Sequence, residues 1–273
     1  LGLHPDDIEY IQGDTDKVGF GEGTGGSRSA TMSGSAFHQA SEKIVTKAKM
    51  IAAHNLKVDV ADVNFAEGIF SSAKTNRTMT IKDVAQEAVN PAKLPRNTEV
   101  GLFATAVYTS EVENFPNGTH ICEVEVDPET GHVEMVRYSV VDDVGTVMNP
   151  LLLKGQIVGG VAQGVGQILM ENISFDATGQ LVTGSFMDYA MPRADQLPSF
   201  TAEFTEIPCT THPLGIRPGG EGGTTPALGV MINAVVDALS EFGVKHVEMP
   251  ATPERIWRAI REAKNSPKRP ATA

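Results

Sequence analysis

The sequence predicts an α+β fold in which mixed sheets pack against helices. Three observations favour this class. Apolar residues recur at helical spacing over residues 33–56, alternating apolar and charged residues flank a turn at 127–131, and the expected strands and helices do not alternate regularly. The 273 residues, 41% of them hydrophobic, suffice for one large or two small domains. We expect two lobes over residues 1–265, with a boundary near 110–120, and a disordered tail over 266–273.

Composition bears on whether the protein binds nucleic acid, contains disulfides or spans a membrane. The 22 Lys and Arg against 34 Asp and Glu give a formal net charge of −12, which disfavours nucleic acid. Cys122 and Cys209 are too few for a disulfide framework, so we expect a reducing, cytoplasmic compartment. The most lipid-like segment, residues 151–170, carries Lys154 and three glutamines and is too polar to span a membrane. The chain begins with Leu1 and not Met, which favours a piece of a longer chain.

The first 110 residues are predicted to contain two strands, one hairpin and two helices. Thr80 can cap a short helix, and Pro91 and Pro95 mark the loop after it. The expected elements are a short strand at 8–13, an amphipathic helix at 33–56, a hairpin at 63–70 turning at Glu67 and Gly68, a helix at 81–89 and a strand at 100–108.

The remaining residues are predicted to hold two further hairpins and three helices. Asp127-Pro128-Glu129-Thr130-Gly131 is a clear turn signal between alternating runs. The expected elements are a hairpin at 122–141, a helix opened by Asn149 and Pro150, a hairpin at 175–189 turning at 176–179, a strand at 201–207, a helix to Leu239 capped by Thr224 or Thr225 with Pro226 in its first position, and a last helix opened by Thr252 and Pro253.

The helix after Pro150 is unusually dense in glycine, and each interior glycine costs about 1 kcal/mol relative to alanine. Close packing on another backbone or on a bulky ligand would offset that cost. Helix packing alone, with exposed glutamines, is the alternative. The glycines are Gly155, Gly159, Gly160, Gly164 and Gly166, and the candidate amide contacts are Gln156, Gln163 and Gln167.

The stretch from His212 to Pro226 places one carboxylate, Glu221, among glycines. Glycine lacks a Cβ, so the backbone on either side can approach a ligand closely. A helix is expected to start just after it, and the unpaired N–H groups at a helix start favour an anion. A plain surface turn that contains a glutamate is the alternative.

A second glycine cluster, residues 21–29, matches the dinucleotide fingerprint at glycines 21, 23 and 26. A polar loop separates these glycines from the preceding strand, so a nicotinamide dehydrogenase site is disfavoured. Successive N–H groups beside Arg28 can instead form an anion-binding nest.

Glu221 has no partner residues of a catalytic set, because the chain offers no triad, no paired carboxylate and no metal-binding histidines near it. This pattern favours a single general base that acts on something bound, namely a cofactor. We expect no protein metal ligands. Asp142 and Asp143 are adjacent, so on a strand their side chains point to opposite faces and do not cooperate directly.

Three motifs, in this order, resemble the large molybdenum subunit of the molybdenum hydroxylases, the family of xanthine dehydrogenase, aldehyde oxidase and aerobic carbon monoxide dehydrogenase. They are Gly25-Gly26-Ser27-Arg28-Ser29, residues 155–164 (GQIVGGVAQG), and residues 213–223. The segments 127–131 and 233–239 are similar as well. The resemblance covers nearly the whole chain but only the C-terminal part of that subunit. It implies that residues 1–265 form a C-terminal molybdenum cofactor-binding domain.

The resemblance implies an oxidoreductase that hydroxylates an aldehyde, an N-heterocycle or carbon monoxide with oxygen from water. The general character of the sequence favours the carbon monoxide dehydrogenase-like branch of this family. Gln163 matches the glutamine whose amide reaches toward the molybdenum's oxo group, and Glu221 matches the general base. In this family the cofactor's own sulfurs hold the metal, which agrees with the missing protein ligand set.

The resemblance also implies the cofactor and its partners. Gly26, Ser27 and Arg28, with Ser29 beside them, match the loop whose backbone lies against molybdopterin, for which the cytosine dinucleotide form is one candidate. The implied partners are the N-terminal part of the same subunit, an iron–sulfur subunit and an FAD subunit in an oligomer, with a small-molecule substrate. Without that N-terminal part we expect the isolated chain to be inactive.

One departure from the family concerns the residues before Glu221. Pro218-Gly219-Gly220 stands where the family usually has Gly-Val-Gly, which changes the expected stiffness of the loop. Two interpretations remain open. Either the chain supplies the base and cofactor contacts of a molybdenum hydroxylase, or it is a non-catalytic module that binds an anionic cofactor or serves as a scaffold in a larger complex. The first needs the Glu221 carboxylate, and the second tolerates glutamine there.

Overall fold

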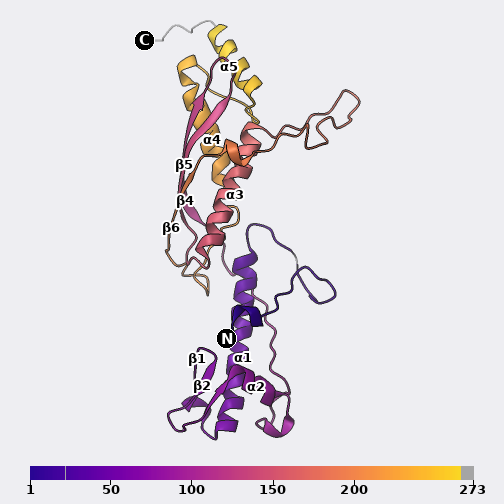
Figure 1. Cartoon of the computed structure of the whole chain (residues 1–273), viewed down its shortest axis with the longest axis vertical. Helices are drawn as coiled ribbons and strands as arrows, with labels where there is room; N and C mark the ends of the chain where they lie inside the picture. Colours follow the sequence, from indigo (N-terminus) through magenta and orange to yellow (C-terminus); the bar gives the residue numbers. More distant parts are fainter. Residues whose placement is uncertain (22, 266–273) are drawn as a thin grey trace. The chain divides into compact units, whose positions relative to one another are not determined.

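The structure, a computed structural model, describes residues 1–21 and 23–265. Residue contacts divide the chain into two units, Leu1–Glu111 and Val112–Ala273 (Figure 1). Each unit has its own buried apolar core. That these units are the lobes of one domain stays a prediction, and the expected disordered tail over 266–273 lies outside the described residues.

Unit 1 is organised around a long helix, α1 (Ser29–Leu56). Its C-terminal half packs into the core of the unit, where Ile51 and Ala52 are fully buried. The helix begins earlier than the predicted residue 33, because the N–H of Met32 already donates to the carbonyl of Arg28 (2.8 Å). It ends where Lys57 adopts the left-handed conformation (φ 62°), a common helix terminator.

A small antiparallel sheet and a short helix complete the core of unit 1. The turn between β1 and β2 has positive φ at both Glu67 and Gly68, as a two-residue type I′ hairpin requires, so the predicted hairpin is confirmed. Thr80 and Asp83 form a capping box, which confirms the predicted helix start. The elements are β1 (Asn64–Ala66), β2 (Ile69–Ser71), β3 (Thr78–Thr80) and α2 (Ile81–Ala88), paired in the order β1-β2-β3.

The predicted strands at 8–13 and 100–108 are wrong. Both segments are irregular, and no strand of the described chain pairs with them. Tyr10 is 57% exposed and Val107 is 77% exposed. A β-ladder needs a partner edge, so local apolar alternation alone does not make a strand.

Unit 2 contains a three-stranded sheet in the order β4-β5-β6. β4 (Asn117–Val126) and β5 (Val133–Asp143) form the antiparallel hairpin predicted around the turn 127–131. β6 (Phe200–Thr205) pairs with β5 in parallel, and α3 (Pro150–Leu169) lies between them in the chain. The α+β class is confirmed, although this unit includes one βαβ crossover that the sequence did not indicate.

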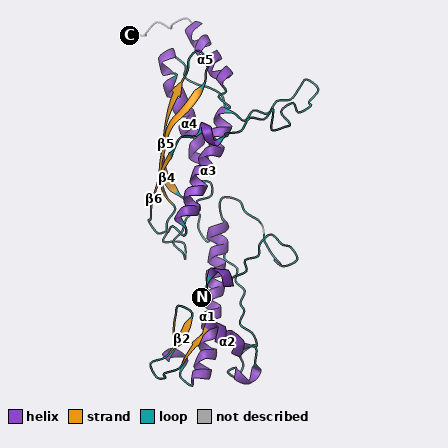
Figure 2. Ribbon diagram, viewed as in Figure 1, coloured by secondary structure: helices purple, strands orange, loops and turns teal. Residues whose placement is uncertain are grey.

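Helices α3 and α4 cover one face of the sheet and pack against each other (Figure 2). Asn149 caps α3 as predicted. The predicted cap of α4 (Thr224–Ala238) is wrong: Gly223 is the N-cap residue and makes no side-chain cap bond, so Pro226 is the third helical residue and not the first. The last helix, α5 (Pro253–Asn265), begins where it was predicted.

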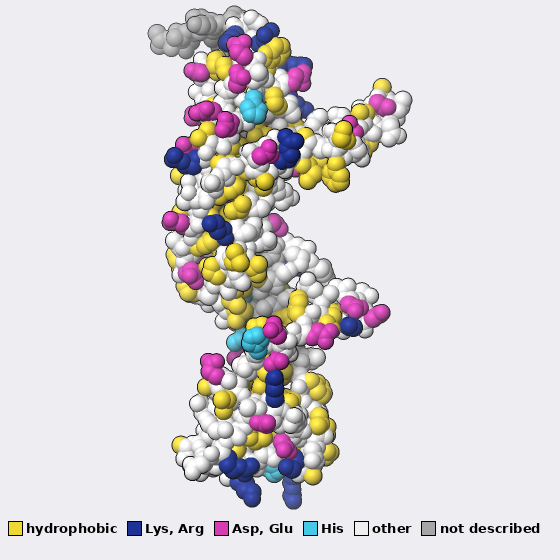
Figure 3. All heavy atoms as spheres, viewed as in Figure 1, with side chains coloured by type: hydrophobic (Ala, Val, Ile, Leu, Met, Phe, Trp, Pro, Cys, Tyr) yellow, Lys and Arg dark blue, Asp and Glu magenta, His cyan; other side chains and the backbone are white. Residues whose placement is uncertain are grey.

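Residues 171–198 form an irregular arm that projects from the rest of unit 2 (Figure 1). The hairpin predicted at 175–189 reduces to one isolated bridge between Phe175 and Leu181, because the returning residues find no further ladder partner. The arm carries exposed hydrophobic side chains (Figure 3), among them Phe186 at 90% and Met187 at 94% exposure. Within the described residues, no helix combines the length and the apolar character that a membrane crossing requires.

Candidate cofactor-binding and catalytic site

The loop that carries Glu221 rests directly on α3 and on the end of β5. A Cβ added at Gly223 would lie 2.1 Å from the carbonyl oxygen of Ile157, and one at Gly219 would lie 3.0 Å from Leu153 Cδ1. A real Cβ does not come within 2.1 Å of a backbone oxygen, so Gly223 must be glycine on this path, whereas at Gly219 the leucine side chain would have to shift slightly. Gly219, Gly222 and above all Gly223 therefore pack closely against α3.

Gln163 lies beside the start of α4. The hydroxyl of Thr224 donates to Gln163 Oε1 at 3.2 Å, and both side chains reach the surface of unit 2. Glu221 precedes this contact, is exposed, and accepts a backbone hydrogen bond from the N–H of Thr225 (3.2 Å). The structure thus brings Gln163 and the Glu221 loop together within unit 2, with both polar groups accessible.

The glycine-dense helix is explained in part by close packing. A Cβ at Gly160 would lie 2.8 Å from the backbone nitrogen of Thr224, and one at Gly164 would lie 2.6 Å from Ala227 Cβ. Gly155 and Gly159 have no atom within 4 Å of the Cβ position. Packing against α4 therefore explains Gly160 and Gly164. Gly155 and Gly159 instead border open space, beside the exposed side chains of Gln156 and Gln163, as expected where a ligand packs.

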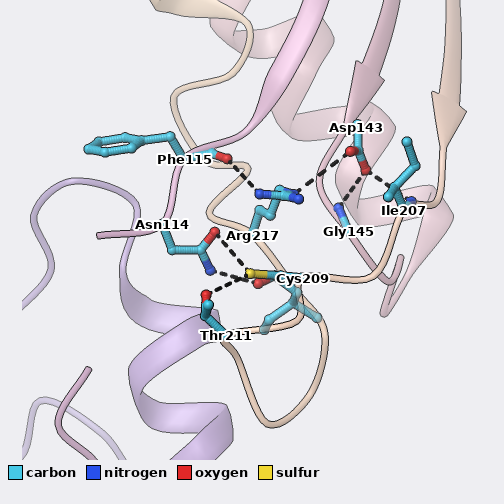
Figure 4. Close-up of polar contacts among 9 residues, drawn as sticks. Asn114, Phe115, Asp143, Gly145, Ile207, Cys209, Thr211 and Arg217 are labelled. Atoms are coloured by element: carbon cyan, nitrogen blue, oxygen red, sulfur yellow. Dashed lines mark hydrogen bonds and ion pairs between the residues drawn. The ribbon is translucent and has the colours of Figure 1, made fainter. Parts of the chain in front are cut away.

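Buried polar contacts hold the segment that leads to Glu221 (Figure 4). Asp143 Oδ1 accepts hydrogen bonds from the N–H groups of Gly145 (2.9 Å) and Ile207 (3.2 Å). Its other oxygen lies 3.7 Å from Arg217 Nε. The N–H of Arg217 donates to the Val144 carbonyl at 2.6 Å. The carboxyl end of β5 is thereby joined to both halves of the loop between β6 and α4.

Cys209 lies in the same cluster and is 7% exposed. Its Sγ is 3.3 Å from Thr211 Oγ1 and 3.6 Å from Asn114 Oδ1. The Thr211 hydrogen bond and, to a smaller degree, the charge of Arg217 lower the pKa of the thiol. Asn114 also donates to the Ile216 carbonyl at 2.8 Å. No local pattern in the sequence indicated this cluster, because Asn114 is distant in the chain from Cys209 and Ile216.

The second glycine loop, in unit 1, is open. Gly26 (φ 59°) and Ser27 (φ 58°) both have positive φ, and no atom lies within 4 Å of the Cβ position of Gly23, Gly25 or Gly26. Arg28 donates to the Gly23 carbonyl at 3.2 Å, and Thr24 is hydrogen-bonded to Ser29. These contacts tie the loop to the first turn of α1 without covering its glycines.

The orphan polar atom in this loop is Ser27 Oγ, which is buried and forms no hydrogen bond within the described residues. A ligand that accepts or donates a hydrogen bond there fits the loop better than an apolar one. The predicted cofactor-binding residues 26–29 thus belong to unit 1, and Gln163 and Glu221 belong to unit 2. Among residues 1–21 and 23–265, no group of three or more His, Cys, Asp or Glu is arranged to hold a metal ion.

Comparison with known proteins places these features in a family. The family model described as the molybdopterin cofactor-binding domain matches residues 1–198. Nicotine 6-hydroxylase large subunit of Paenarthrobacter nicotinovorans is 37% identical over 264 residues, and carbon monoxide dehydrogenase large chain of Hydrogenophaga pseudoflava is 34% identical over 263 residues. Each alignment covers 96% of this chain and 32% of the relative, so the chain spans about a third of the length of these proteins.

Solved structures agree with these matches. The structure of the Cu,Mo-CO dehydrogenase in its carbon monoxide reduced state matches with a TM-score of 0.88 at 32% identity, over 97% of this chain and 34% of that one. Quinoline 2-oxidoreductase from Pseudomonas putida 86 matches with a TM-score of 0.79 at 33% identity, over 89% of this chain and 31% of that one. The chain therefore belongs to the molybdopterin cofactor-binding domain family, within the molybdenum hydroxylases.

Proposed function

We propose that this chain holds a molybdopterin cofactor and supplies Glu221 as the general base for the oxidative hydroxylation of a small substrate. One observation carries the proposal: Glu221 is an exposed carboxylate on a loop whose neighbouring glycines are packed against α3, next to the exposed amide of Gln163. A base must be held in a fixed place to take a proton efficiently. When bound, the molybdenum cofactor supplies the two-electron redox chemistry.

Cofactor binding, orientation of the reacting group and proton transfer are proposed for different residues of this chain. The backbone of Gly26 and Ser27, together with Arg28 and Ser29, binds the anionic cofactor through N–H groups and a guanidinium. The buried hydroxyl of Ser27, which has no partner in the described chain, supports this assignment. Gln163 orients the reacting group through its amide, and a carboxylate oxygen of Glu221 accepts the proton that the reaction releases.

The substrate class follows from the relatives and stays broad. The relatives include enzymes named for carbon monoxide, nicotine and quinoline. We favour carbon monoxide or an N-heterocycle over an aldehyde, since the aldehyde oxidoreductases of Desulfovibrio match at 22% and 23% identity. We propose the cytosine dinucleotide form of the cofactor, an electron path through iron–sulfur and FAD subunits, and a cytoplasmic location. The exposed apolar arm supports contact with the remaining part of the large subunit.

The alternative is a module that binds the cofactor, or serves as a scaffold, without chemistry of its own. Glu221→Gln in the assembled enzyme separates the two. We expect unchanged molybdenum content and a fall of about 100-fold or more in the rate of substrate-driven cofactor reduction. Glu241→Gln, an exposed glutamate beyond the other end of α4, is the matched control. A Glu221→Gln enzyme as fast as the native one would favour the scaffold, and native enzyme without molybdenum would refute cofactor binding.

A further inference from the structure

A chain of buried polar side chains crosses the sheet of unit 2. Tyr138 and Asp142 lie on β5, and His120 lies on β4. His120 Nδ1 is 2.8 Å from the Tyr138 hydroxyl, and His120 Nε2 is 3.1 Å from Asp142 Oδ1. The side chains of His120 and Asp142 are 2% and 5% exposed, and Tyr138 is fully buried. When Tyr138 donates to Nδ1, the Nε2–H of His120 donates to Asp142, so every link is satisfied.

Asp142 ends this chain beneath the Glu221 loop. Its Oδ1 faces His120, but its Oδ2 is buried and accepts no hydrogen bond from the described residues. A Cβ added at Gly222 would lie 3.6 Å from this Oδ2. The unpaired oxygen therefore faces the Cβ position of the residue that directly follows Glu221.

Burying a carboxylate oxygen without a partner is unfavourable, so nearby positive charge must compensate for it. Gly222 leads into the N-cap of α4, Gly223, which makes no side-chain cap bond. The first N–H groups of a helix carry partial positive charge and attract a carboxylate. The start of α4 is thus a source of that compensation, and the attraction draws the loop toward Asp142.

We infer that Asp142 is a positioning residue for Glu221: Tyr138 and His120 fix its carboxylate, and the charge of its unpaired oxygen attracts the partial positive charge at the start of α4, which draws Gly222 toward the sheet. The neighbouring Asp143 holds the other part of the loop through Ile207 and Arg217. Two consecutive residues of β5 therefore act on different parts of one loop. The catalytic consequence rests on the proposed function of Glu221, whereas the anchoring does not.

The test is Asp142→Asn in the assembled, full-length enzyme. The amide keeps the volume of the side chain and removes its charge. We expect backbone hydrogen exchange in residues 216–223 to accelerate about tenfold or more, while α1 in unit 1 keeps its native exchange. Molybdenum content and the half-saturating substrate concentration stay native, and the rate of cofactor reduction at saturating substrate falls. Native exchange over residues 216–223 would overturn the inference.

Glu203→Gln is the matched control, because it removes a carboxylate from the exposed face of the same sheet, in the residue before the pairing partner of Asp142. We expect native exchange and a native rate; loop exchange accelerated as much as in Asp142→Asn would overturn the inference. If the Asp142→Asn enzyme does not assemble, hydrogen exchange of the Tyr138→Phe enzyme tests the inference instead. The substitution removes only the hydroxyl that orients His120, and it should accelerate the same segment by a smaller factor; no acceleration would contradict the inference.

The inference and the proposed function fail separately. Faster exchange in Asp142→Asn together with a native reduction rate in Glu221→Gln would refute the role of Glu221 and leave the anchoring intact. Native exchange in Asp142→Asn together with a slow Glu221→Gln enzyme would refute the anchoring and leave the base in place.

Discussion

Two glycine-rich loops each precede a long helix, and glycine has a different role in each loop. In unit 1, Gly23 and Gly26 have positive φ, and a Cβ on either would meet nothing within 4 Å. In unit 2, none of the glycines flanking Glu221 has positive φ, but Gly223 is packed against the carbonyl of Ile157. The first loop needs glycine for its conformation, and the second needs it for close packing.

This difference indicates what each loop can do. A loop in an unusual conformation with an open surface presents its backbone N–H groups to a ligand. A loop pressed against a helix cannot shift easily, and it holds the side chain between its glycines in place. In our proposal, binding of the cofactor and placement of the base belong to two loops that use glycine differently.

The largest effect is expected from alanine at the packed loop. The backbone of Gly223 (φ −80°) would accept alanine, but the added Cβ would lie 2.1 Å from Ile157 O. We expect Gly223→Ala to lower the free energy of unfolding of unit 2 by about 3 kcal/mol. Urea unfolding followed by Trp257 fluorescence in α5 measures it.

The control for that change lies inside α4, the helix that Gly223 precedes. Gly229 has no atom within 4 Å of its Cβ position. Gly229→Ala should raise the free energy of unfolding by about 0.5–1 kcal/mol, since alanine is the better helix former. Equal effects of the two substitutions would remove the distinction between packed and open glycines.

A smaller, pH-dependent effect tests how tightly α4 covers the sheet. Cys122 Sγ lies 3.1 Å from Met231 Sδ, and burial raises the pKa of this thiol to about 11. The folded state favours the neutral thiol, so its contribution is complete below the unfolded pKa near 9 and is lost as pH rises toward 11.

We therefore expect unit 2 to lose stability between pH 9 and 11, and Cys122→Ala to reduce that loss by about 1 kcal/mol, because partial exposure screens the charge. The free energy of unfolding of both proteins, measured at pH 8 and pH 10.5, gives the difference. The same pH dependence in both proteins would mean that the thiol is not buried under α4.

Local signals predicted much of the fold. The Glu67–Gly68 turn, the Thr80 capping box and the 127–131 hairpin each depend on residues close in sequence, and all three are present. The strands expected at 8–13 and 100–108 failed because alternation does not reveal whether a partner strand exists. The parallel pairing of β5 with β6 likewise depends on a distant segment.

The candidate site shows the same limit. The sequence predicted that Asp142 and Asp143 do not cooperate directly, and in the structure they have separate partners, His120 and Arg217. It did not predict those partners, which are distant in the chain. The motif resemblance proposed Gln163 and Glu221, whereas the contact of Gln163 with Thr224 and the packing of the glycines required the three-dimensional arrangement.

The most direct test measures molybdenum content and substrate-driven cofactor reduction on the same preparations of native, Gly25→Asp and Glu221→Gln enzyme. Gly25 lies in open space without positive φ, so aspartate adds only bulk and negative charge to the loop. We expect Gly25→Asp to lose most of its molybdenum with native folding, and Glu221→Gln to keep its molybdenum and lose its rate. Full molybdenum in Gly25→Asp, or a native rate in Glu221→Gln, would contradict the assignment of binding and base to the two loops.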